Sequence, residues 1–203
     1  MPDKAISNTS PLLYLHRCGG LAWLPRLFTL VCVPGAVAFE LAEGRSRGFD
    51  VPNPEDHSWM KITDPQATPS EWFAADLGAG EIAAMSLALE HPDHILLLDD
   101  ALARRTAIAA GLSIWGTLRI LLEAKSSGLI ESVKPVIHRL EKSGMWVSED
   151  IRRRVLALAD DSFDDAHWIE NLATTVTRTA VRHWDPEHHR HYSSELAGKL
   201  AAF

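Results

Sequence analysis

Short apolar runs, bounded by glycine, proline or polar residues, recur along the first 147 residues of the chain. Runs of this length that are rich in β-branched residues are typical of buried strands. The run that Pro34 closes is the clearest of them, because proline does not continue a central strand. The pattern predicts strands at 5–7, 29–33, 59–63, 94–98 and 112–115.

Helix-like stretches separate these runs. Ser10 and Pro11 predict the start of the first helix, because serine caps helices and proline is tolerated at their first position. Gly19 and Gly20 predict its end, and the Pro- and Gly-rich segment 44–57 predicts a loop. Strand and helix in alternation predict an α/β fold, with a central parallel sheet flanked by helices. Further helices are predicted at 21–27, 35–43, 81–90, 100–110 and 117–125.

The last part of the chain, 148–203, carries no strand pattern. Ser148 precedes two acidic residues, which is typical of a helix start, since serine caps the helix and acids favour its positive end. We therefore expect two parts, an α/β domain at 1–147 and a C-terminal helical extension at 148–203. The helices of the extension are predicted at 149–160, 165–183 and 194–202.

Composition and termini bear on where the protein works. The chain is 46% apolar and 23% charged, as folded soluble proteins are. Cys18 and Cys32 stand in apolar surroundings without metal-like spacing, which indicates reduced, buried thiols. The start lacks the layout of a signal peptide, and no apolar run approaches the ~18 residues that span a bilayer. We expect a cytoplasmic protein that does not enter a membrane.

The net charge of −7 narrows the function classes. It excludes a protein that coats nucleic acid with a basic surface. It does not exclude an enzyme that handles RNA through a metal ion, because the ion bridges acidic residues to a phosphate.

Polar and acidic residues follow the predicted strands where these end. Asn8 follows the first strand, Glu40 lies in the helix after the second, and Glu81 opens the helix after a glycine turn. Asp99 and Asp100 follow the fourth strand. Ligands of open parallel sheets bind beyond the carboxyl ends of the strands, so these side chains are expected at one rim. Converging carboxylates are unfavourable unless a cation neutralises them, and oxygen ligands favour Mg²⁺ or Mn²⁺.

A divalent ion held by carboxylates lowers the pKa of bound water and stabilises charge on a phosphodiester. The predicted rim therefore fits hydrolysis of a phosphate ester, in RNA or in a small substrate. A simpler interpretation stays open for each acid, which can be a solvated surface group or a helix cap. Asp99 and Asp100 in particular are placed to cap the helix that follows them.

The segment from Ala5 to Leu13, Ala-Ile-Ser-Asn-Thr-Ser-Pro-Leu-Leu, resembles the opening of PIN-like proteins. The similarity is to a bacterial, uncharacterised branch related to VapC-type toxins, and it covers about residues 4 to 158. Four further blocks follow in the order and spacing of that branch: Val33-Pro34 with Glu40-Leu41, Leu77-Gly78-Ala79-Gly80-Glu81, Leu97-Leu98-Asp99-Asp100 with Arg104, and Gly116-Thr117-Leu118 with Leu121-Leu122.

The resemblance implies a PIN fold and metal-dependent ribonuclease activity, often in a toxin that a cognate antitoxin inhibits. Relatives with this fold commonly form homodimers. Carried over by position, Glu40, Glu81 and Asp100 are the expected metal-site acids, and Asp99 is a neighbour able to substitute for one of them. Thr117 is the expected hydroxyl near the site.

Asn8 departs from the family pattern, which has aspartate at this position. An asparagine offers a neutral carbonyl oxygen, so it is able to ligate a metal ion but binds it more weakly than a carboxylate does. Two hypotheses follow from this departure. The chain is either a metal-dependent endoribonuclease or a catalytically weak or inactive PIN-like protein that binds nucleic acid or an antitoxin.

Overall fold

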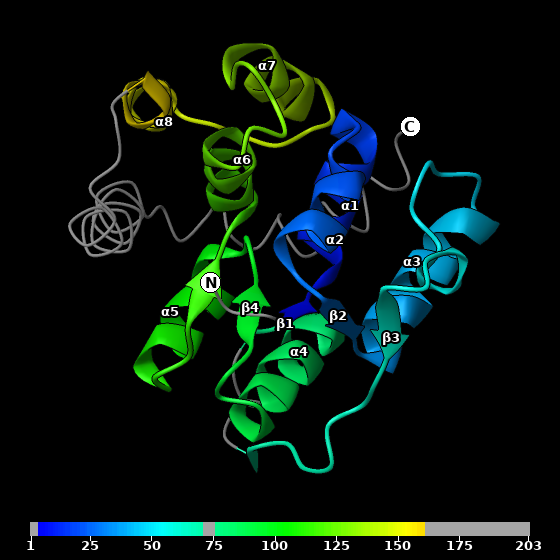
Figure 1. Ribbon diagram of the computed structural model, residues 1–203. Coiled ribbons are helices and arrows are strands. Elements are labelled where there is room, and N and C mark those ends of the chain that lie inside the picture. The colour runs from blue at the N-terminus through cyan, green and yellow to red at the C-terminus, as the bar shows by residue number, and fades with distance from the viewer. Residues whose placement is uncertain (1–3, 71–75, 161–203) are drawn as a thin grey trace.

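The computed structural model describes residues 4–70 and 76–160 (Figure 1). One sheet holds all the described strands, in the order β3-β2-β1-β4-β5, and every pairing in it is parallel. The predicted α/β fold with a central parallel sheet is confirmed. The strands are β1 (Lys4–Ser7), β2 (Leu30–Val33), β3 (Met60–Ile62), β4 (Ile95–Leu97) and β5 (Ile114–Trp115).

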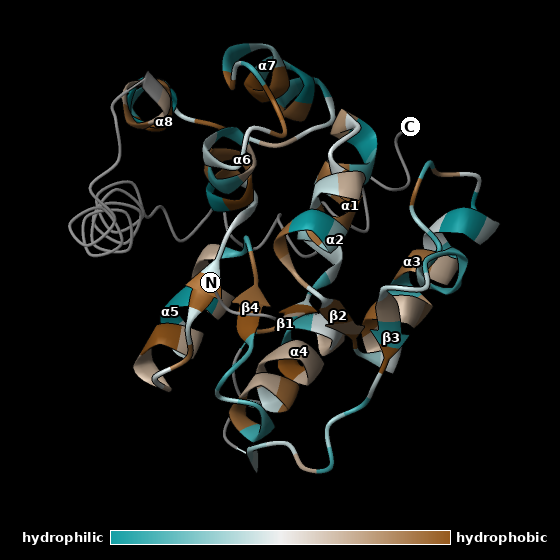
Figure 2. Ribbon diagram, in the orientation of Figure 1, coloured by the Kyte–Doolittle hydropathy of each residue, from teal (hydrophilic) through white to brown (hydrophobic). Residues whose placement is uncertain are grey.

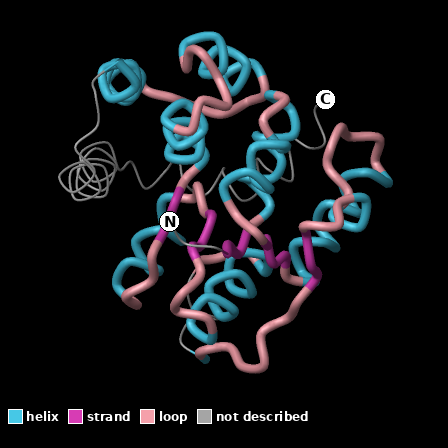
Figure 3. Tube along the Cα trace, viewed as in Figure 1, coloured by secondary structure: helices cyan, strands magenta, loops and turns pink. Residues whose placement is uncertain are grey.

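Helices cover both faces of this sheet, as Figures 1 and 3 show. α4 and α5 lie on one face, and α1, α6 and α7 lie on the other. The predicted helices at 165–183 and 194–202 lie outside the described residues. The helical elements are α1 (Thr9–Cys18), η1 (Leu21–Trp23), α2 (Leu24–Leu27), α3 (Gly35–Ser46), η2 (Pro54–Asp56), α4 (Ala79–Glu90), α5 (Ala101–Ala109), α6 (Thr117–Ser126), α7 (Lys134–Lys142) and α8 (Glu149–Asp160).

Two apolar cores result from the alternation of side chains along the strands. Ala5 and Val31 point into the larger core, under α1, α3, α6 and α7. Ile6 and Cys32, the next residues along the same strands, point into the smaller core under α4 and α5. Figure 2 shows the apolar strands between the two helical layers. Because both faces are covered, the central strands β1, β2 and β4 are mostly buried, which explains why they read as short apolar runs.

At the centre of the sheet, between β1 and β4, the direction in which successive strands are added changes. From β1 the chain moves outward to β2 and β3, and then it crosses back to add β4 and β5 on the other side of β1. Ligands of doubly wound sheets bind at such a reversal, beyond the carboxyl ends of the two central strands. Asn8 follows β1 directly, and Asp99 and Asp100 follow β4 by two and three residues.

The first helix begins earlier than predicted. Asn8 occupies its N-cap with an extended backbone, and α1 begins at Thr9. Ser10 lies buried inside the first turn, so the prediction that Ser10 caps this helix is wrong. Pro11 is tolerated there because the first turn of a helix has no carbonyl partner for its N–H groups. Gly19, with a φ of 78°, ends the helix as predicted.

Other boundaries move by a few residues. α3 continues to Ser46, beyond the predicted end at 43, and α7 was not predicted. The predicted helix at 149–160 is confirmed as α8, and the hydroxyl of Ser148 accepts a hydrogen bond from the N–H of Ile151 at 3.2 Å.

Cys18 and Cys32 are free and buried. Among the described helices, none is long and apolar enough to cross a bilayer.

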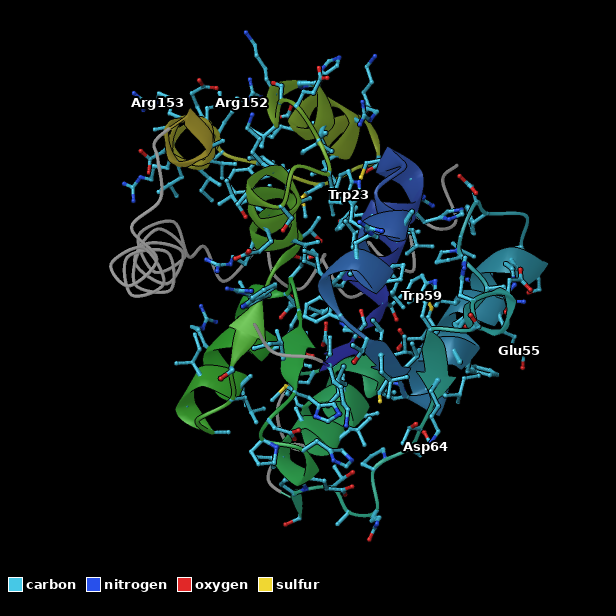
Figure 4. The ribbon with its side chains drawn as sticks, in the orientation of Figure 1. Trp23, Glu55, Trp59, Asp64, Arg152 and Arg153 are labelled. Carbon is cyan, nitrogen blue, oxygen red and sulfur yellow. The ribbon has the colours of Figure 1, made fainter. Side chains whose placement is uncertain are left out.

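The apolar face of α8 packs against the chain's own core. Val155 is buried in the larger core, Ile151 and Leu158 pack against that core, and α8 contacts α6. Arg152 lies on α8 in Figure 4 and pairs with Glu141 of α7. This face is therefore not free for a second copy or a partner. A domain boundary between residues 147 and 148 stays a prediction.

The orientation of α3 can be tested at two of its residues that differ in burial. Leu41 is 1% exposed in the larger core, whereas Phe39 is 69% exposed. We expect Leu41→Ala to lower the free energy of unfolding by about 2–5 kcal/mol, because it leaves a cavity. Phe39→Ala is expected to change it by no more than about 0.5 kcal/mol. Urea denaturation of both variants measures this, and equal losses would contradict the orientation of α3.

Candidate functional site

The carboxyl end of β1 approaches the start of α4 closely at Gly80. A Cβ atom added to Gly80 would lie 2.7 Å from Oε1 of Glu40 and 3.0 Å from Oδ1 of Asn8. A larger residue at position 80 would therefore have to displace the carboxylate of Glu40. The N–H of Gly80 donates a hydrogen bond to Oε1 of Glu40 at 3.0 Å. Residues from β1, α3 and α4 thus meet at one point.

Asn8 presents an unsatisfied oxygen at this point. Its side chain is 3% exposed, and its Oδ1 has no hydrogen-bond partner among the described residues. A buried acceptor without a donor is unfavourable by about 1–3 kcal/mol. The hydroxyl of Thr9 donates instead to Oε2 of Glu40. Two kinds of oxygen, one neutral and one anionic, therefore face the same point.

Glu81 stands one residue further along α4. Its Oε2 accepts a hydrogen bond from the N–H of Gly78 at 2.7 Å, which anchors the carboxylate at the helix start. Burial, the largest cause, acts together with the negative charges of Asp100, Glu40 and Asp76 to raise the pKa of Glu81 to about 7. The hydrogen bond from Gly78 opposes this shift. The contributions of Asp100 and Glu40 to this shift place their negative charges near Glu81.

Asp99 is held by α6. It accepts hydrogen bonds from the N–H of Thr117 at 2.8 Å and from the hydroxyl of Thr117 at 2.6 Å. Burial raises the pKa of Asp99, while both bonds from Thr117 and the charge of Arg104 oppose the rise. Arg104 in turn donates to the carbonyl oxygen of Leu98 at 2.7 Å. Asp99 and Thr117 therefore join the end of β4 to the start of α6.

Asp100 is the N-cap of α5, and its Oδ1 accepts a hydrogen bond from the N–H of Ala103 at 2.8 Å. The simpler interpretation, that this aspartate caps a helix, is thus correct for one of its oxygens. Its charge also acts on Glu81 and on Asp99. Capping does not exclude a second role for Oδ2, since a carboxylate accepts several bonds.

The structure brings some of the predicted site residues into contact and leaves others apart. Asn8 and Glu40 meet at Gly80, and Asp99 meets Thr117. Among the described residues, no three of the acidic side chains bring ligand oxygens within 4.8 Å of one another. A bare ion enclosed by carboxylates does not match this spacing. A hydrated divalent ion does, because Mg²⁺ usually keeps several waters and takes only one or two carboxylates.

Sequence reasoning missed three residues that organise the rim. Thr9 and Gly80 hold the carboxylate of Glu40. Asp64, labelled beyond β3 in Figure 4, accepts a hydrogen bond from the N–H of Gly35 at 2.6 Å and so fixes the start of α3. Asp64 follows a strand, as the predicted acids do, so the same signal was present for it. The close approach of Gly80 to Glu40 and Asn8 has no such signal, because it depends on residues distant in the chain.

A family model described as a PIN domain matches residues 4–161. The chain belongs to the PIN domain family. A PIN domain has a nuclease-like fold, and PIN domains generally use divalent metals. The match includes α8, which packs on the rest of the PIN domain. The chain matches no curated protein and no solved structure.

Glu81 predicts how the stability of this PIN domain depends on pH in the absence of metal. Its pKa in the folded protein, about 7, exceeds the ordinary value of 4.5. The fold therefore binds this proton more tightly than the unfolded chain does. The stability that the protonated carboxyl contributes is complete below about pH 4.5 and is lost as the pH rises through about 7.

Glu81→Gln mimics the protonated carboxyl and keeps an oxygen for the N–H of Gly78. We expect this variant to be more stable than the wild type at pH 8 in EDTA, by at most about 3 kcal/mol, and to match it near pH 4.5. Urea denaturation at both pH values measures the difference. The control is Glu55→Gln, an exposed acid on the outer side of the fold (Figure 4). A gain at pH 8 in the control as well would contradict the assignment to Glu81.

Proposed function

We propose that this PIN domain is a ribonuclease that hydrolyses RNA phosphodiester bonds with Mg²⁺ or Mn²⁺. The ion would keep several waters and lie among Asn8, Glu40, Glu81 and Asp100, with one or two of the carboxylates as direct ligands and the other side chains bound through water. The observation that carries the proposal is the buried, unpartnered Oδ1 of Asn8, which faces the same point as the carboxylate of Glu40. An acceptor buried beside carboxylates is unfavourable by itself, and a divalent cation relieves both the missing bond and the repulsion.

The residues around the ion have separate tasks in this proposal. Thr9 and Gly80 hold Glu40 in place, and the capping bond to Ala103 holds Asp100. Asp99 uses its oxygens on Thr117, so we propose that it positions the end of β4 and acts on the ion only as a neighbouring charge. A bound divalent ion supplies a water of lowered pKa and stabilises the charge that develops on the phosphate.

The charge of the rim supports a phosphodiester substrate only when a cation is present. Glu40, Glu81 and Asp100 repel a phosphate, and Arg104 is directed to the carbonyl oxygen of Leu98. Without the ion, the negative charge of these residues would therefore disfavour the binding of RNA. This proposal predicts binding and cleavage that both depend on metal.

We further propose that the protein is the toxin of a VapC-type toxin–antitoxin pair and acts in the cytoplasm. The five sequence blocks shared with that branch support this, as does the family match over 4–161. A cognate antitoxin would have to cover the acidic rim. Phe39, exposed on α3 next to Glu40, offers an apolar contact beside that rim for an antitoxin or for a second copy in a homodimer.

A second candidate function rests on Asn8 itself. Because the usual aspartate is replaced by a neutral amide, the rim carries one negative charge fewer and holds a cation less strongly. The chain would then be a catalytically weak or inactive PIN domain that binds nucleic acid or an antitoxin.

Asp100→Asn tests the enzyme proposal. Asparagine keeps an oxygen for the N–H of Ala103 and removes only the charge. We expect Mn²⁺-dependent cleavage of RNA by the wild type, lost in EDTA, and a rate at least about 100-fold lower in the variant. Asp56→Asn, which changes an exposed acid of η2, is the matched control. Free nucleotides are assayed beside RNA to detect a small-molecule phosphatase. Purified wild type, free of antitoxin, that cuts no RNA in Mn²⁺ would end the enzyme proposal.

Asn8→Asp separates the two candidate functions. If the chain is a weakened nuclease, the added carboxylate should tighten Mn²⁺ binding by about tenfold and raise the cleavage rate, because affinity follows the charge of the ligands. In EDTA the same charge should lower the midpoint of unfolding, since it is buried beside Glu40. Calorimetric titration with Mn²⁺ measures the affinity, and Ser58→Asp adds the same charge on an exposed loop as a control. Unchanged Mn²⁺ affinity would favour the inactive binding protein.

A further inference from the structure

A second group of metal-ligating side chains lies at the other end of β4 from the acidic rim. His91, Asp93 and His94 occupy the turn between α4 and β4, and the N–H of His94 donates to the carbonyl oxygen of His91 at 3.0 Å. One ligand-capable atom from each side chain lies within 4.8 Å of the other two. His94 precedes β4 and Asp99 follows it, so strand geometry separates the two groups by roughly 16 Å.

The distances in this turn are close to those of a metal site. Nδ1 of His94 lies 3.0 Å from Oδ1 of Asp93, and the rings of His91 and His94 have centroids 4.9 Å apart. A tetrahedral zinc ion with bonds of about 2.0–2.1 Å separates its ligands by about 3.3 Å. The distance between the ligand atoms of His94 and Asp93 is within a few tenths of an ångström of this ligand–ligand separation. An ion would take the place of the proton that these two atoms share.

Burial differs among the three side chains in a way that suits binding. The side chain of His94 is 7% exposed and that of Asp93 is 73% exposed. His91 is half-buried. One ligand is thus fixed by the fold, and the other two are able to move the short distance that closes the site. The turn is fixed on its helix side, because Glu90 accepts hydrogen bonds from the N–H groups of Gln66 and Ala67 at 2.6 and 3.0 Å.

We propose that His91, Asp93 and His94 form a binding site for a zinc-class transition-metal ion, such as Zn²⁺, Co²⁺ or Ni²⁺. Two imidazoles and one carboxylate select these ions, whereas the acidic rim, with oxygen ligands alone, selects Mg²⁺ or Mn²⁺. Three protein ligands leave the fourth position to water. The ion clamps the turn that joins the end of α4 to β4, and its effect is on stability. The site does not depend on the ribonuclease activity.

The test uses Co²⁺ as a probe, because a Co²⁺ ion with nitrogen ligands absorbs visible light, and then Zn²⁺ as its competitor. The full-length protein carries Asp100→Asn, so that the acidic rim contributes less. Histidines at 183, 188, 189 and 191 are also potential ligands, so a second background replaces these four with glutamine. His91→Gln and Asp93→Asn are compared with His138→Gln, an exposed histidine on α7. His94→Gln is left out because its side chain is buried.

We expect one Co²⁺ ion to remain bound in the background without the four C-terminal histidines, and Zn²⁺ to displace it. His91→Gln and Asp93→Asn should each weaken this binding at least about tenfold, whereas His138→Gln should not. Saturating Zn²⁺ should raise the midpoint of thermal unfolding in the wild type and not in His91→Gln. Loss of all Co²⁺ absorption when the four C-terminal histidines are replaced would overturn the proposal. Equal affinity in wild type and His91→Gln would overturn it too.

Discussion

The concentration of negative charge beside the backbone of Gly80 is the constraint on which the arrangement of this PIN domain depends. Glu40 and Asn8 turn oxygens toward the same point, and a side chain at position 80 would displace the carboxylate of Glu40. Glu81 and Asp100 add their charges within range of it. Such an arrangement is unfavourable in a folded chain by itself, so the rest of the structure has to hold it.

The parallel sheet brings these polar groups together through the order of its strands. β1 and β4 are parallel neighbours at the centre of the sheet although about 90 residues separate them, and the later strands are added on the opposite side of β1 from β2 and β3. Each strand therefore delivers a polar side chain to the same edge. Short hydrogen bonds then fix the individual groups: Thr9 and Gly80 hold Glu40, Gly78 holds Glu81, and Thr117 holds Asp99. The donors are mostly backbone N–H groups at helix starts, which favour negative charge.

The two ends of β4 differ in chemistry as well as in place. The carboxyl end gathers side-chain oxygens at the point where the strand order reverses. The amino end presents imidazoles in a tight turn next to the smaller core. Hard metal ions prefer oxygen ligands, and borderline ions accept imidazole nitrogen. The two groups that flank β4 would therefore bind different classes of ion. Asn8 fits this picture as a residue that lowers the charge of the rim while it keeps an oxygen there.

The sequence by itself determined the α/β class, the five strands within one or two residues and the acids that follow them, because period and turn residues are local signals. It also determined the family resemblance. The start of α1 at Thr9 and the helix α7 were missed although local signals were present, since asparagine is a common N-cap residue and α7 has an amphipathic pattern with a proline in its first turn. Only the tertiary structure decided that Gly80 packs against Glu40 and Asn8, and that Asp99 is hydrogen-bonded to Thr117. These facts depend on residues distant in the chain that meet only when the sheet has formed, and no local pattern contains their separation.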